Sequence, residues 1–191
     1  MINLLLILIS SMLINNIVLM QFLGLCSFFG VSTKMKSVVG MGMAVVVVIF
    51  LSALITFPLY NLVLVPLGIA YIDTIAFILV IASLVQLTEL VIKRFSQSLY
   101  KALGVYLPLI ATNCAVLGVA LTNIATPQSY PEALMFALGS GLGYAFIIIT
   151  FTAIRLRLDT ANTPKALKGL PIAFVTASLM AMAFMGLAGI I

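Results

Sequence analysis

Six long apolar segments follow one another along the 191-residue chain, separated by short polar stretches. A helix needs about 20 residues to cross roughly 30 Å of hydrocarbon, and each segment is near that length or longer. The expected spans cover residues 3–31, 38–57, 72–92, 99–122, 131–154 and 170–191. The pattern therefore predicts an all-α membrane protein with six transmembrane helices, forming a single membrane domain over residues 1–191.

Spans one and four carry residues that interrupt a helix. Glycine destabilises a continuous helix, and asparagine can bond the backbone groups that an interruption releases. We therefore expect both spans to be broken, and we expect Pro58 to end the second span. The interrupting residues are Asn15, Asn16 and Gly24 in the first span, and Pro108, Thr112 and Asn113 in the fourth.

The nine Lys and Arg residues occur only in three clusters, at residues 34–36, 93–101 and 155–168. About 55 residues separate successive clusters, which is enough for two crossings and a return to the same side. Positive charge marks the cytoplasmic face of a membrane protein. Both termini are therefore predicted to lie outside the cytoplasm.

The composition excludes several classes of function. Hydrophobic residues make up 64% of the chain and charged residues 7%, against roughly 25% charged in a soluble domain. The net charge of +5 is better explained by contact with lipid headgroups than by nucleic acid. The chain has no His, so its Ser and Thr lack the usual activating base, and we expect no catalytic residue.

The two halves of the chain resemble each other. The sequence GMGMA at residues 40–44 matches GLGYA at residues 141–145, and IAF at residues 75–77 matches IAF at residues 172–174. Asn16 and Asn113 are likewise separated by 97 positions. A three-helix unit crosses an odd number of times, so its copy is inverted in the membrane. We expect two inverted repeats, about residues 1–95 and 98–191, with the glycines allowing close helix approach.

The two cysteines, Cys26 and Cys114, fall in different halves, and each follows an interrupting residue. Both are expected near the middle of the membrane. Three interpretations are open: inert small hydrophobes, a disulfide, or thiolate ligands of a soft metal or iron–sulfur cluster. Two thiolates do not complete a four-ligand site, so the third interpretation requires ligands from another chain.

Other polar residues allow a structural and a functional interpretation. Asn15, Asn16, Thr112 and Asn113 are expected at similar depth, where they could satisfy helix breaks or tune a bound cluster. Glu89 lies four residues before Lys93, which suits an interfacial ion pair. An intramembrane carboxylate at Glu89 could instead belong to an ion path.

Several motifs resemble the A-type membrane protein of the Rnf complex over essentially the whole chain. They are FLGLC at residues 22–26, GVSTK at residues 30–34, LPLIATNCAVLG at residues 107–118 and ASLMAMAFMG at residues 177–186. The sister family is the E-type membrane protein of the sodium-translocating NADH:quinone reductase. One difference is RLRL at residues 155–158, where the family pattern has an acidic residue.

The resemblance implies a function. Rnf is a redox-driven translocase of the bacterial or archaeal inner membrane, which moves electrons between ferredoxin and NAD and couples this to Na⁺ or H⁺ translocation. Its A-type protein pairs with a homologous six-helix protein of opposite topology, the E type, and assembles with the B, C, D and G types. The pair shares a [2Fe-2S] cluster, whose ligands here would be Cys26 and Cys114, with Gly24, Asn16, Thr112 and Asn113 around them.

Two competing functions fit the same patterns. Inverted repeats with broken helices also occur in secondary transporters, for which both cysteines would be dispensable. A purely structural membrane anchor would leave the cysteines inert.

Overall fold

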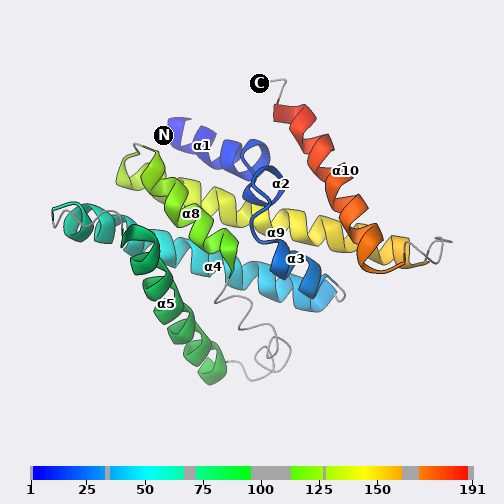
Figure 1. Cartoon of the computed structure of the whole chain (residues 1–191), viewed down its shortest axis with the longest axis horizontal. Coiled ribbons are helices and arrows are strands. Elements are labelled where there is room, and N and C mark those ends of the chain that lie inside the picture. Colours follow the sequence, from blue (N-terminus) through cyan, green and yellow to red (C-terminus); the bar gives the residue numbers. More distant parts are fainter. Residues whose placement is uncertain are drawn as a thin grey trace.

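Every regular element that the computed structural model describes is a helix (Figure 1). The described residues are 2–32, 35–66, 72–95, 113–126, 128–160 and 168–188. In chain order the elements are α1 (Ile2–Ile9), the π-helix η1 (Ser10–Ile14), α2 (Ile17–Met20), α3 (Leu25–Val31), α4 (Met35–Leu59), the π-helix η2 (Tyr60–Leu64), α5 (Asp73–Phe95), α8 (Cys114–Ala125), α9 (Tyr130–Thr160) and α10 (Leu170–Ala188).

Two of the described helices are long and apolar enough to cross a membrane, over Ser37–Leu64 and Tyr130–Leu158. Shorter apolar helices occupy part of each of the other four expected spans, at Leu4–Ile14, Thr74–Leu87, Cys114–Ala125 and Leu170–Gly186. The all-helical class is thus confirmed for the described residues. The six crossings and the extracytoplasmic termini stay predictions.

Helices α4 and α9 form the centre of the molecule, side by side and running in opposite directions (Figure 1). Small residues allow this contact. A Cβ on Gly42 would lie 3.3 Å from the Cβ of Ala145, and one on Gly141 would lie 3.3 Å from the Cα of Val46. The expectation that glycines on these two helices permit close approach is confirmed.

The first segment of the chain packs against α9 over two further glycines. Gly139 faces the carbonyl oxygen of Leu8, and Gly143 faces the carbonyl oxygen of Met12. A Cβ on Gly143 would come within 2.7 Å of both that oxygen and the Nδ2 of Asn16. The interruption after η1 therefore rests directly on the backbone of α9.

The first segment is broken where the sequence predicted. The Oδ1 of Asn16 accepts a hydrogen bond from the amide of Val18 at 3.1 Å and so caps α2, while its Nδ2 donates to the carbonyl of Met12 at 3.0 Å. A second interruption precedes α3 at Gly24, whose φ is +90°. In the fourth span, Pro108 and Thr112 lie outside the described residues.

The expectation that Pro58 ends the second span is wrong. Helix α4 continues to Leu59 and passes into η2. Proline deprives the Leu54 carbonyl of its helical donor, but the hydroxyl of Tyr130 donates to that carbonyl at 3.3 Å. Because another helix replaces the missing donor, the proline is tolerated within the helix.

Helices α5 and α10 diverge from the central pair on opposite flanks (Figure 1). Their outer faces expose large apolar side chains, among them Leu79 and Leu90 on α5 and Phe174 and Met182 on α10. Apolar surface of this extent requires lipid or another chain to cover it.

Replacing Gly143 by alanine should destabilise the protein by about 1–3 kcal/mol, because the new methyl group overlaps the backbone of the first segment. Thermal unfolding of the detergent-purified complex would measure the loss. Gly186→Ala is the matched control, since a Cβ there meets no atom within 4 Å. Equal unfolding temperatures for the two variants would contradict the close packing of the first segment on α9.

Candidate metal centre

The two cysteines lie together at the start of two helices. Cys26 is the second residue of α3, and Cys114 is the first residue of α8. Their Sγ atoms are 3.9 Å apart, although 88 positions separate them in the sequence. Both thiols are free, so the disulfide interpretation does not hold in this structure. Cys26 is exposed and Cys114 is partly buried.

Gly24 connects the helix break to the thiol pair. Its backbone N–H donates to the Sγ of Cys114 at 2.8 Å. Its φ of +90° is accessible to glycine and strained for other residues. A Cβ at this position would also lie 3.0 Å from the ring of Tyr144 and 3.2 Å from the Cβ of Ala115. The conformation that presents the N–H to sulfur is therefore one that favours glycine.

Tyr144 of α9 supports the break from the interior, and sequence reasoning did not identify it. Its side chain is buried, and its hydroxyl lies 2.7 Å from the Oγ of Ser27. Because Ser27 donates its own proton to the Gly24 carbonyl at 2.9 Å, Tyr144 acts as the donor in this pair. The repeated sequence GLGYA indicated helix packing, but only the tertiary structure places this phenol beside Gly24.

Asn16 and Asn113 act as equivalent caps. The Oδ1 of Asn113 accepts from the amide of Ala115 at 3.1 Å, as Asn16 does for α2, and both residues are buried. The predicted satisfaction of backbone groups at the helix breaks is confirmed for these two residues. Asn15 is exposed and lies away from the thiols, along a separate cavity. Thr112 lies outside the described residues.

Arg155 of α9 holds the other end of α3. Its guanidinium donates to the carbonyl of Phe29 and to the hydroxyl of Ser32. A cation at a helix carboxyl end is stabilised by the unpaired carbonyl groups there. The acidic residue that the family pattern places near Arg155 is therefore not required for this contact, which the sequence alone did not indicate.

Glu89 lies on α5, a different helix from either cysteine, and is partly buried. The structure therefore does not bring it into the thiol site. Its role in an ion path stays a hypothesis.

The thiol pair fits half of a tetrahedral metal site. Two thiolates bound to one metal at about 2.3 Å would lie about 3.8 Å apart, close to the observed separation. Backbone N–H donation to a ligand sulfur is one of the contacts that tune iron–sulfur centres. Within the described ranges, no three His, Cys, Asp or Glu residues come together to hold a metal. Any further ligands would have to come from another chain.

Apolar helices around a pair of open thiols define a class: helical proteins that carry part of a soft-metal site. More specifically, the chain belongs to the Rnf-Nqr family, whose model, described as "Rnf-Nqr subunit, membrane protein", matches residues 4–191.

Curated relatives, all A-type members of their complexes, match over nearly their full length. The chain is 52% identical over 187 residues to the one from the Na(+)-translocating ferredoxin:NAD(+) oxidoreductase complex of Acetobacterium woodii, covering 98% of this chain and 97% of that protein. It is 49% identical over 189 residues to the one from the ion-translocating oxidoreductase complex of Syntrophotalea carbinolica, covering 99% and 98%. The corresponding protein of Aeromonas salmonicida is 49% identical over 187 residues, covering 98% and 97%.

Removing the Arg155 side chain should destabilise the protein by about 1–3 kcal/mol, because Arg155→Ala leaves the carboxyl end of α3 without its charged donor. Arg157→Ala is the control, since Arg157 lies on the same helix and is exposed. Thermal unfolding and the rate of Cys26 labelling by a maleimide would both report the change. Indistinguishable behaviour of the two variants would refute the role of Arg155.

Proposed function

We propose that this chain is the A-type membrane component of an ion-translocating ferredoxin:NAD oxidoreductase complex. In this role it carries electrons across the membrane through a [2Fe-2S] cluster shared with a homologous protein, and the complex couples that transfer to Na⁺ or H⁺ translocation. The observation that carries the proposal is the pair of free thiols, 3.9 Å apart and open on the Cys26 side. The names of the relatives support the redox and ion-translocating parts.

The geometry supports a site completed by a second chain. Cys26 and Cys114 supply two of the four thiolates that such a cluster needs. Cys26 is exposed, so a facing protein can approach it directly. Among the described residues there is no third ligand nearby that would make the site self-sufficient.

When bound, an iron–sulfur cluster takes up and gives back single electrons. The chain's own residues would then act as follows. The N–H of Gly24 donates to the Cys114 sulfur and favours its charged form. Asn113 caps α8 and so sets the direction of its first residue, Cys114. Tyr144 closes the site from the interior and excludes water there.

The proposed topology is six transmembrane helices arranged as two inverted repeats, about residues 1–95 and 98–191. Two observations support it. Helices α4 and α9, the second helices of the two repeats, run in opposite directions (Figure 1). Asn16 and Asn113, which occupy matching positions, cap their helices with the same hydrogen bond at 3.1 Å. In this arrangement both termini lie outside the cytoplasm of an inner-membrane protein.

The proposed partners are the other members of the Rnf complex. A homologous six-helix protein of opposite topology, the E type, would donate the remaining thiolates at the exposed Cys26 side. The B, C, D and G types would complete the complex. The apolar outer faces of α5 and α10 provide surface for such neighbours and for lipid.

Cys26→Ala and Cys114→Ala should each remove the two irons of this cluster from the purified complex, together with one electron paramagnetic resonance signal. Ferredoxin-driven NAD reduction and the associated ion uptake should fall to background. Ser178→Ala is the control, because its exposed hydroxyl on α10 bonds only within its own helix. Full iron content and full activity in either cysteine variant would overturn the proposal and favour a transporter or an anchor.

A further inference from the structure

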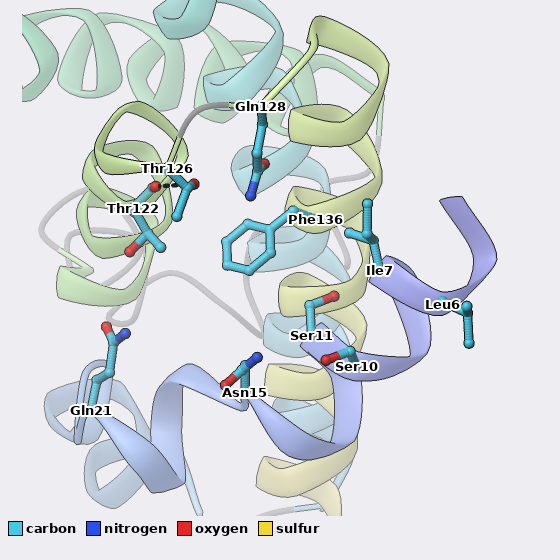
Figure 2. A pocket seen from close by; sticks show the side chains of 10 residues that line it. All are labelled: Leu6, Ile7, Ser10, Ser11, Asn15, Gln21, Thr122, Thr126, Gln128 and Phe136. Atoms are coloured by element: carbon cyan, nitrogen blue, oxygen red, sulfur yellow. Dashed lines mark hydrogen bonds between the residues drawn. The ribbon is translucent and has the colours of Figure 1, made fainter. Parts of the chain in front are cut away.

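A second polar region lies away from the thiols, in a cavity of about 500 Å³ between the first segment and helices α8 and α9 (Figure 2). In a chain that is 64% hydrophobic, most of the residues lining this cavity are polar. All of the lining side chains are uncharged. The thiol site does not use any of them.

The hydroxyl groups of this cavity present acceptors and not donors. Ser11 donates its proton to the carbonyl of Leu8 at 3.0 Å, and Thr122 donates to the carbonyl of Gly118 at 2.8 Å. Thr126 donates to the carbonyl of Thr122 at 2.8 Å (Figure 2). Since each proton is used within its own helix, the free electron pairs of the oxygens are left for a ligand.

Two amide oxygens at the same end lack a partner. The Oδ1 of Asn123 and the Oε1 of Gln128 are buried, and neither has a hydrogen-bond partner in the structure. Asn123 is 2% exposed, and its Nδ2 is held by the carbonyl of Ala133 at 3.4 Å. Both residues line a smaller cavity of about 120 Å³, which shares Thr126 and Gln128 with the larger one. A buried acceptor left unpaired costs about 1–3 kcal/mol, so these oxygens call for a ligand.

The electrostatics of this end favour a cation. Helix α8 ends at Ala125, so its unpaired carbonyl groups point toward Thr126 and Gln128. The opposite helix terminus is already neutralised, because the Glu132 carboxylate accepts from the amide of Ser129 at 2.8 Å. The basic residues of α9 lie at its other end. Oxygen ligands without a fixed carboxylate suit a hard monovalent cation that has shed part of its water.

We propose that Asn123, Thr126 and Gln128 form a binding site for a hard monovalent cation, Na⁺ or Li⁺ in preference to K⁺, at the end of the molecule opposite the Arg155 side. The site rests on the proposed function, since its biological use is as an entry or exit point for the translocated ion. The larger cavity extends from this site to Asn15 and Gln21, at the two interruptions of the first segment (Figure 2).

The test measures cation affinity in the assembled complex. Calorimetric titration with NaCl, LiCl, KCl or choline chloride gives equilibrium binding, and vesicle uptake gives the Na⁺ concentration for half-maximal transport. Gln128→Leu and Asn123→Leu each remove one ligand oxygen and should weaken Na⁺ binding about tenfold. Gln86→Leu makes the same chemical change on the exposed face of α5 and should have no effect.

A second variant covers the case in which the leucine substitutions disturb assembly. Gln128→Glu keeps the shape of the side chain and adds a negative charge, so Na⁺ should bind about tenfold more tightly at a pH above the carboxylate's pKa. Na⁺ affinity within twofold of the wild type in Gln128→Glu would overturn the site, as would equal binding of choline. In that case the two acceptors hold only water.

Iron content separates this inference from the proposed function. All variants of Asn123 and Gln128 should retain the iron and the paramagnetic signal that Cys26→Ala removes. Altered Na⁺ affinity with full iron supports the cation site by itself. If the cysteine variants also retained their iron, the proposed electron-transfer function would fail while the cation site stood.

Discussion

The need to satisfy backbone groups inside apolar surroundings is the constraint on which this structure depends. An interrupted helix releases N–H and C=O groups, and a hydrocarbon environment offers them no water. Asn16 and Asn113 bond the groups released at two of the interruptions. At the third, the Gly24 N–H finds the sulfur of Cys114. The proposed metal centre is therefore built from the same contact that makes the helix break tolerable, and the polar groups at the break need no water from outside.

Helix α9 is the platform on which these contacts are assembled. Its glycines let the broken first segment lie directly on its backbone, and Tyr144 reaches the turn that carries Gly24. One turn of the helix thus serves packing, and a neighbouring residue serves the site. Farther along, Arg155 holds the carboxyl end of α3. Both ends of the short helix that bears Cys26 are in this way attached to a single long helix, which limits the movement of the exposed thiol.

The polar groups of this chain gather at two places with different chemistry. Around the thiols they are donors directed at sulfur or at released carbonyls, which suits an anionic ligand set. Between α8 and the start of α9 they are acceptors without protons to offer, which suits a cation. Membership of the Rnf-Nqr family, whose relatives are named as ion-translocating oxidoreductases, gives both kinds of site a role in one protein.

Much of this could be predicted from the order of residues, because hydrophobic length, charge placement and helix-breaking residues act locally. Those features indicated an all-helical chain, an interruption near Asn16 and Gly24, close approach at the paired glycines, and two cysteines with special surroundings. Other features depend on residues far apart in the sequence. Pro58 does not end its helix, because the Tyr130 hydroxyl supplies the missing donor from α9. The 3.9 Å approach of the two thiols and the unpartnered oxygen of Asn123 were likewise decided only by packing, since each requires helices from different parts of the chain to meet.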